Sequence, residues 1–181
     1  PGIDLEVFRP ALNEKSDNDK IIIGTIGRLE EYKGTAYVIK AFQLLRQELG
    51  ERVELHVAFG EEVMGNIEGV TVFYPNGDDN LADYYRSLDI YVCAGTVQLD
   101  AIHYPVLESM ASKIPVITTG YYPATIVNAE IVPIRDAEAI KQKLLKIISD
   151  KDDVKINKAF EDVKQFEWTQ IANKMLNYFK N

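Results

Sequence analysis

Residues 20–50 read KIIIGTIGRLEEYKGTAYVIKAFQLLRQELG, and this stretch predicts a β-strand, a glycine-rich loop and an α-helix in succession. The β-branched run at 21–23 indicates a buried strand over 20–28. Between 35 and 49 the apolar residues recur at helical spacing, and Gly50 is a typical helix end. A buried strand followed by an amphipathic helix is the usual opening of a βαβ unit.

The same alternation continues along the chain. Strands are expected at 53–59, 70–74, 90–93, 115–118 and 131–132. Helices are expected at 80–85 (capped by 78–80), 105–112, 136–148, 152–165 and 168–179. The apolar stripe that begins at Trp168 is interpreted as packing. Together these elements predict a Rossmann-like α/β fold, with a parallel sheet and helices on both faces. Such sheets bind ligands beyond the carboxyl ends of their strands.

Composition limits the partners. With 181 residues the chain is about one domain long. Twenty basic and 28 acidic residues give a net charge of −8, which argues against nucleic acid as a partner. The single cysteine, Cys93, excludes an intrachain disulfide, and no apolar run reaches the ~18 residues of a membrane span. The chain opens with proline and without a signal peptide, so we expect a cytoplasmic piece of a longer protein.

The loop at 24–34 contains two well-placed cations. Gly27 permits close approach of a ligand to the backbone, and Arg28 and Lys33 stand at the strand end and just before the helix. A forked guanidinium and an ammonium beside a helix amino terminus suit a diphosphate. The alternative is that both are ordinary solvated cations of a surface loop.

A second candidate segment reads DAIHYPVLE at 100–108. Asp100 and Glu108 bracket a turn that leads into a helix, and Glu108 is expected in its first turn. The backbone N–H groups of Ile102, His103 and Tyr104 are expected to face an anionic or hydroxyl-bearing ligand. The alternatives are a helix-dipole role for Glu108, an ordinary loop carboxylate for Asp100, and a surface or packed ring for His103.

Taken in order, these motifs resemble the carboxyl-terminal half of GT-B glycosyltransferases of the large retaining group 1 (family 4) type. The segments that carry the resemblance are PGID at 1–4 with FRP at 8–10 for the interdomain linker, GRL at 27–29 with KG at 33–34 for the "GRL…KG" signature, YYRSLDIYV at 84–92, DAIHYPVLE at 100–108 for the "E-x7-E" motif, and PVLESMASKIPVI at 105–117 for "P-x-x-E-A-M-A-x-G-x-P-V-I".

The resemblance implies a domain plan and a function. Residues 1–19 would be the interdomain linker, and 20–181 the Rossmann-like nucleotide-sugar-binding domain, with 166–181 a terminal helix that packs on the missing N-terminal half. The whole enzyme would move a hexosyl or deoxyhexosyl group from a nucleotide-diphosphate sugar to a cell-surface glycan or its lipid-linked precursor, with retention. The missing half would bind that acceptor and give peripheral contact with the inner membrane. The isolated domain is expected to be inactive.

The resemblance also assigns roles to the candidate residues. Arg28 and Lys33 would hold the diphosphate and stabilise the departing nucleotide, so neither a metal nor another cofactor is expected. Glu108 would bind the ribose hydroxyls, and Asp100 would bind the donor sugar and join the two cations as a catalytic residue. The backbone contacts to sugar and phosphate would come from Gly27, Ile102, His103 and Tyr104.

Departures from the family pattern leave a second interpretation open. Asp100 stands where the family has glutamate, and Ala101, His103 and Lys113 stand where it has glycine. These changes crowd a backbone that is meant to approach the donor. A non-catalytic glycosyltransferase-like partner subunit is therefore the alternative, and an unrelated Rossmann-type binding module is a third possibility.

Overall fold

The computed structural model describes residues 2–12, 20–97 and 101–180. Its centre is a six-stranded parallel sheet with the order β3-β2-β1-β4-β5-β6. The strands are β1 (Ile21–Ile26), β2 (Val53–Ala58), β3 (Val70–Phe73), β4 (Ile90–Cys93), β5 (Val116–Thr118) and β6 (Glu130–Ile131). The Rossmann-like α/β fold predicted from the sequence is thereby confirmed.

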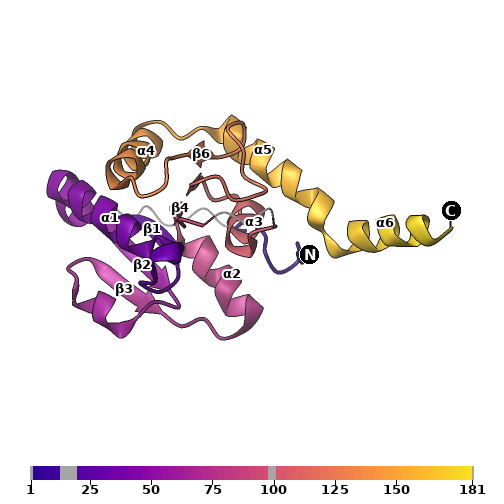
Figure 1. The fold of residues 1–181 in the computed structure, drawn as a ribbon, viewed down its shortest axis with the longest axis horizontal. Helices are drawn as coiled ribbons and strands as arrows, with labels where there is room; N and C mark the ends of the chain where they lie inside the picture. The colour runs from indigo at the N-terminus through magenta and orange to yellow at the C-terminus, as the bar shows by residue number, and fades with distance from the viewer. Residues whose placement is uncertain (1, 13–19, 98–100, 181) are drawn as a thin grey trace.

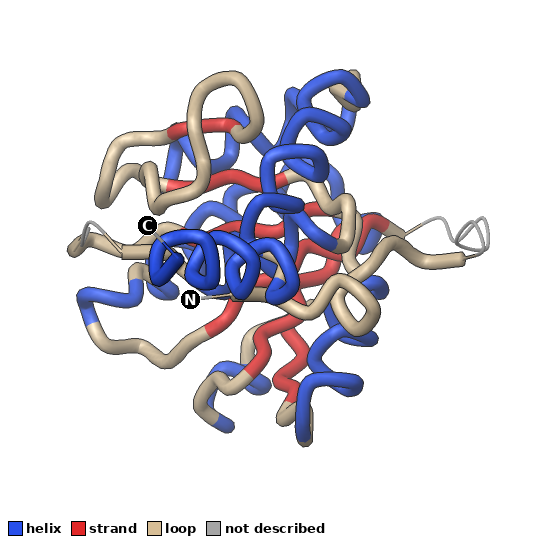
Figure 2. Tube along the Cα trace, turned by 90° about the vertical axis from the view of Figure 1, so that its right-hand side faces the viewer, coloured by secondary structure: helices blue, strands red, loops and turns tan. Residues whose placement is uncertain are grey.

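Helices cover both faces of the sheet (Figures 1 and 2). They are α1 (Thr35–Leu49), α2 (Gly77–Ser87), α3 (Tyr104–Ala111), α4 (Ala137–Ser149), α5 (Asp153–Val163) and α6 (Trp168–Lys180). Helices α1 and α4 pack together on one face, where Phe42 and Leu144 are fully buried. Helices α2, α3 and α5 pack on the other face, where Tyr85 and Leu107 are fully buried. Because both faces are covered, the strands read as near-continuous apolar runs.

The strand order places a switch point between β1 and β4. From β1 the chain runs on to β2 and β3 on one side, and β4 then pairs with the opposite side of β1 through Ile23–Ile90 and Gly24–Tyr91. A crevice opens at such a point, beyond the carboxyl ends of the two strands. The loops that follow Ile26 and Cys93 therefore flank the expected ligand site.

Two helix starts differ from those expected. Helix α2 begins at Gly77, so Asp78 and Asp79 lie in its first turn rather than at its cap, and Asn76 precedes it without a side-chain cap. Helix α3 begins at Tyr104, which places Glu108 in the second turn rather than the first. In contrast, the cap expected from Asp136 is confirmed, since its carboxylate accepts a hydrogen bond from the Ala139 N–H at 2.8 Å.

The expectation that the stripe on α6 is packed is wrong for the described residues. Helix α6 extends away from the sheet and its covering helices (Figure 1), and Trp168 is 53% exposed. Its ring lies against the amino-terminal segment, because a β-carbon on Gly2 would lie 2.6 Å from it, and its backbone N–H donates to the Ile3 carbonyl at 3.2 Å. The amino-terminal segment joins the start of α6 through the Ile3 N–H and the Phe166 carbonyl at 2.8 Å. Within the described ranges, no helix is both long and apolar enough to cross a membrane.

Candidate functional site

The loop between β1 and α1 is held against the end of β4. Thr96, which follows β4, donates its N–H to the Tyr32 carbonyl at 3.0 Å and its hydroxyl to the Glu31 carbonyl at 3.1 Å. Both acceptors belong to the short 3₁₀ turn Glu31–Lys33 that precedes α1. The two hydrogen bonds therefore fix the position of Lys33 relative to β4.

Two further contacts secure the same loop. The Leu29 N–H donates to the Glu61 carboxylate at 3.0 Å, and Arg135 pairs with the Glu31 carboxylate at 2.8 Å. The pKa of Glu31 is lowered by its hydrogen bond from Arg135, and the hydroxyl of Tyr37 lowers it further. The ion pair is exposed and contributes little stability, so its effect is to orient the loop. Sequence reasoning missed Glu61, Thr96 and Arg135, which come from three different connections.

The two expected phosphate cations remain free to reach a ligand. Arg28 and Lys33 are both exposed, and the Lys33 ammonium lies 5.3 Å from the centre of the Tyr32 ring. Gly27 is buried at φ +129°, a conformation that L side chains rarely adopt, and its N–H donates to the Ala58 carbonyl at 3.1 Å. The expected cations thus project from a loop whose backbone is fixed.

His103 lies directly before α3 and faces the end of β4. Its Nδ1 is 3.8 Å from the Cys93 Sγ, and its ring centre is 4.3 Å from that of Tyr121. Burial lowers the pKa of His103 to about 4, and the Lys33 ammonium lowers it further. The His103 N–H donates to the Tyr122 carbonyl at 2.9 Å. This corrects the expectation that the N–H faces a ligand, because the connection after β5 already uses it.

The connection after β5 closes the same end of the sheet. The Thr119 hydroxyl donates to the Gly95 carbonyl at 2.7 Å, and the Tyr121 hydroxyl donates to the Val97 carbonyl. A β-carbon on Gly95 would lie 2.1 Å from the Tyr121 hydroxyl oxygen, so the two segments are in tight contact. The loops after β1, β4 and β5 therefore meet in one place.

Glu108 is a buried carboxyl on α3. The Tyr85 hydroxyl donates to its Oε2 at 2.9 Å. Burial raises the pKa of Glu108 to about 7, and the charge of Asp78 adds to this effect while the Tyr85 hydrogen bond opposes it. The carboxyl of Glu108 therefore gains or loses its proton near neutral pH.

The structure describes two of the three remaining expected site residues. Ile102 is half-buried and Tyr104 is exposed, both beside His103 at the start of α3. Asp100, the expected sugar ligand, lies outside the described residues. Within the described ranges, no three His, Cys, Asp or Glu side chains are arranged to hold a metal ion.

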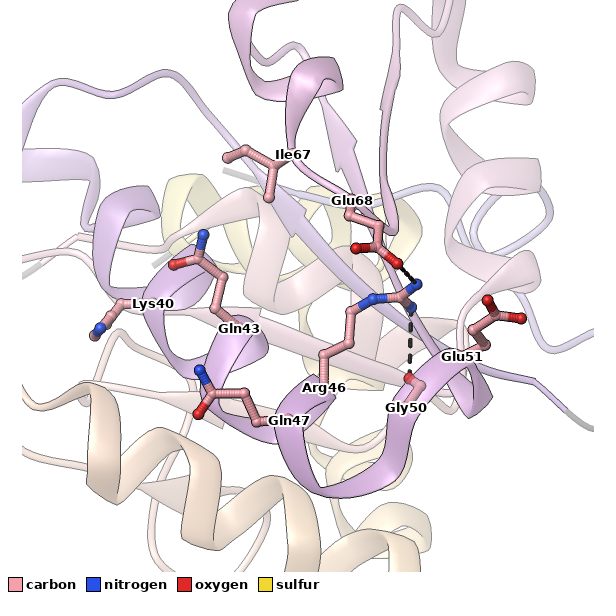
Figure 3. Close-up of a pocket in the computed structure, with 8 residues that line it drawn as sticks. All are labelled: Lys40, Gln43, Arg46, Gln47, Gly50, Glu51, Ile67 and Glu68. Carbon is pink, nitrogen blue, oxygen red and sulfur yellow. Dashed lines mark hydrogen bonds and ion pairs between the residues drawn. The ribbon is translucent and has the colours of Figure 1, made fainter.

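A pocket of about 530 Å³ lies elsewhere, where α1 ends and β2 and β3 begin (Figure 3). Its lining residues are Lys40, Gln43, Arg46, Gln47, Gly50, Glu51, Ile67 and Glu68. The Arg46 guanidinium already pairs with Glu68 at 2.9 Å and donates to the Val53 carbonyl at 2.9 Å. Because this cation is satisfied and the pocket lies at the opposite edge of the sheet from the phosphate loop, we do not regard it as the ligand site.

Comparison with known proteins gives a consistent result. Residues 20–150 match the model of a family described as "Glycosyl transferases group 1". A curated relative is the capsular polysaccharide biosynthesis glycosyltransferase CapM of Staphylococcus aureus, 27% identical over 169 residues, covering 82% of this chain and 44% of that protein. The chain thus spans less than half the length of this relative.

Solved structures share the fold. The C-terminal domain of LpcC, a glycosyl transferase group 1 family protein from Francisella tularensis, is 25% identical with a TM-score of 0.67, covering 96% of this chain and 98% of that one. HepE of Anabaena, in complex with UDP-glucose, is 15% identical with a TM-score of 0.75, covering 99% of this chain and 56% of that one. At 15% identity this second likeness shows the fold alone.

Proposed function

This chain belongs to the group 1 glycosyl transferases, and on that basis we propose that it binds the nucleotide-diphosphate sugar donor of such an enzyme. The observation that carries the proposal is the loop of Arg28 and Lys33. Two exposed cations project from a backbone fixed at the switch point of a Rossmann-like sheet. That place and that charge suit a diphosphate.

The two cations would act most strongly as the sugar leaves. When the bond between the sugar and the distal phosphate breaks, negative charge grows on the nucleoside diphosphate. Cations held in advance near that phosphate stabilise the growing charge and need no reorganisation during the reaction. Arg28 and Lys33 would have this role, and Glu108 would bind the ribose. The backbone of Gly27, Ile102 and Tyr104 would contact phosphate and sugar.

We assign the donor sugar to Asp100 and the overall reaction to the longer protein. The transferred group would be a hexosyl or deoxyhexosyl unit, moved with retention to a cell-surface glycan or its lipid-linked precursor. CapM is named for capsular polysaccharide biosynthesis and HepE was solved with UDP-glucose, and both names support this class of reaction. The acceptor site would lie in an N-terminal half of the longer protein, and that half would also make the peripheral contact with the membrane.

Helix α6 would join the two halves. Met175 is 56% exposed, Leu176 55% and Phe179 78%, so an apolar face stands free on a helix that leaves the domain (Figure 1). We assign this face to the missing N-terminal half. The isolated chain is then expected to bind nucleotide and to transfer almost no sugar.

Calorimetric titration tests the proposal. UDP, GDP, ADP and dTDP and their sugar conjugates are titrated into the protein, and the best ligand is repeated with Arg28→Ala and Lys33→Ala. Loss of one charge-assisted phosphate contact is expected to weaken binding by about tenfold to a hundredfold. Lys40→Ala, in the pocket at the opposite edge, is the matched control and leaves affinity unchanged. Unchanged affinity in both loop variants would overturn the proposal.

A second pair of titrations distinguishes the roles of the two acidic residues, Glu108 and Asp100. Glu108→Gln is expected to weaken the bare nucleotide and its sugar conjugate alike, because it removes a charged acceptor for the ribose. Asp100→Asn is expected to spare the bare nucleotide and to weaken only the sugar conjugate. Equal losses for both ligands in Asp100→Asn would contradict the assignment of Asp100 to the sugar.

The side chain of His103 favours one alternative, a non-catalytic partner subunit with the same fold. The imidazole of His103 lies directly before α3, at a position where the family pattern has glycine, and its ring packs against Tyr121. An assay of the full-length protein for consumption of the donor distinguishes the two functions. Binding without consumption in the presence of acceptor would favour the partner subunit.

A further inference from the structure

The imidazole of His103 lacks a strong hydrogen-bond partner. Its Nδ1 and Nε2 lie 3.8 and 4.0 Å from the Cys93 Sγ, and its face stacks on Tyr121 at 4.3 Å with a tilt of 37°. Among the residues that the structure describes, no oxygen or nitrogen atom is hydrogen-bonded to this ring. Sulfur is a weak partner, so the hydrogen-bonding capacity of the imidazole is almost unused.

The surroundings of this ring are electropositive. Burial is the main cause of the lowered pKa of His103, and the Lys33 ammonium lowers this pKa further. The same ammonium lowers the pKa of Cys93, against the larger raising effect of burial. Directly after His103 comes the amino terminus of α3, whose dipole also disfavours a positive charge on the ring. In the free protein the ring is therefore neutral, and it stands where an anion would be favoured.

From this geometry we propose that His103 is an additional ligand of the donor diphosphate and gains a proton when that diphosphate binds. The inference rests on the proposed function. A phosphate beside Lys33 would offset the positive field of that ammonium, which adds to burial in keeping the ring neutral, and would accept a charge-assisted hydrogen bond from the imidazolium. The proton comes from solvent on binding and returns to solvent when the nucleotide leaves.

Of the titratable groups around the ring, His103 is the one that takes up this proton. Among the described residues, Cys93 from β4 and Tyr121 from the connection after β5 contact the ring, and the charge of Lys33 from the phosphate loop acts on it. Burial raises the pKa of Cys93 to about 12 and also raises the pKa of Tyr121, so both stay neutral from pH 5 to pH 8. Glu108, on α3, titrates near pH 7 and is hydrogen-bonded to Tyr85, so its contribution must be subtracted.

Because the chain has two histidines, His103 and His56, its imidazoles can be followed individually. Nitrogen-15 NMR of the wild-type protein at pH 5.5 is recorded without and with saturating inorganic pyrophosphate, and then with UDP. We expect His103 to change from the neutral to the doubly protonated pattern with both ligands, while His56, on β2, is unchanged. This measurement needs no substitution and is independent of folding defects.

Calorimetry in two buffers of different ionisation enthalpy counts the protons. At pH 5.5 the wild type is expected to take up about 0.2 to 0.9 proton more per pyrophosphate than His103→Gln, which keeps size and hydrogen bonding but does not titrate. His56→Gln is the matched control and behaves as the wild type. If His103→Gln unfolds the protein, His103→Asn replaces it.

The results separate this inference from the proposed function. If pyrophosphate and UDP bind while His103 stays neutral and the proton counts of wild type and His103→Gln agree, the inference about His103 is overturned and the donor site stands. If neither pyrophosphate nor any nucleoside diphosphate binds, the proposed function fails, and the inference fails with it.

Discussion

Gly34 and Ala94 pack so closely that a β-carbon on Gly34 would lie 1.8 Å from the carbonyl oxygen of Ala94. Gly34 also has φ +71°, a left-handed conformation that favours glycine. It stands between Lys33 and α1, so this contact seats the cationic loop against the end of β4. The position of Lys33 relative to the end of β4 depends on the absence of a side chain at Gly34.

The first prediction is that Gly34→Ala destabilises the protein more than Gly50→Ala does. Both glycines have positive φ, but a β-carbon on Gly50 has no neighbour within 4 Å. Gly50 has ψ −139°, outside the left-handed helical region, so Gly50→Ala should cost only the backbone strain, about 1–3 kcal/mol. Gly34→Ala should cost about 2 kcal/mol more, because a backbone carbonyl must move, and should also weaken nucleotide binding. Urea unfolding and titration measure both, and equal stability of the two variants would refute the contact.

A second prediction concerns the pH dependence that Glu108 gives to stability. The pKa of this carboxyl is raised to about 7 in the folded protein, against 4.5 for the ordinary value. The folded state thus holds a proton that the unfolded state has lost, so stability falls as pH rises from about 4.5 to about 7. Glu108→Gln should gain about 1–3 kcal/mol over the wild type between pH 5 and pH 8. A constant difference between the two proteins would contradict the raised pKa.

Tyr85 supplies the control for this pH effect. Its hydroxyl lowers the pKa of Glu108, so Tyr85→Phe should extend the fall in stability to higher pH.

As pH rises, nucleotide affinity should change in the opposite sense to stability. If ribose hydroxyls donate to the ionised carboxylate, binding strengthens as pH rises through about 7, and this rise is absent in Glu108→Gln.

The third prediction is that nucleotide binding does not need a divalent cation. In the proposed site the charges next to the diphosphate would be those of Arg28 and Lys33, and the described residues bring no group of metal-binding side chains together. Titration of the best nucleoside diphosphate in EDTA and in magnesium should give affinities within about twofold. Loss of binding in EDTA and its recovery with magnesium would show that the cations alone are insufficient.

Local patterns in the sequence predicted most of the fold. The helix expected at 35–49 is α1 to the residue, and the cap expected at Asp136 is present. These elements are decided by neighbouring residues, namely apolar spacing and capping side chains, and the sequence shows both directly. The start of α3 was misplaced by one residue because proline is tolerated at either of the first two helical positions. Glu108 is consequently the fifth helical residue instead of the fourth, which places it just beyond the first turn.

The sequence located the candidate site only where it follows strand ends, and the roles of its residues stay predictions. Arg28 and Lys33 could be selected because a glycine-rich loop after a parallel strand is a typical anion site. Thr96 and Arg135 could not, because they reach the same loop from connections that are 65 and 104 residues away from Glu31 in sequence. The exposure of Trp168 could not be predicted from the sequence, because the spacing of apolar residues is the same whether or not another surface covers them.

The last prediction concerns Lys113, which stands at a position where the sequence pattern of the family has glycine. Its φ is +56°, and it follows α3 in a Schellman arrangement. The Lys113 N–H donates to the Met110 carbonyl and the Ile114 N–H to the Ser109 carbonyl, both at 3.1 Å. The Lys113 ammonium lies 4.9 Å from the centre of the Phe160 ring, a contact that offsets part of the backbone strain.

Two substitutions separate the strain from the ring contact. Lys113→Ala and Lys113→Gly both lose the ammonium, but only glycine relieves the left-handed backbone. We therefore expect Lys113→Gly to be more stable than Lys113→Ala by about 1 kcal/mol in urea unfolding. The wild type should lie between them or near the glycine variant, because the contact with Phe160 is worth about 0.5–1 kcal/mol. If Lys113→Ala matches Lys113→Gly, the end of α3 is not held in the left-handed conformation, and the helix terminates in another way.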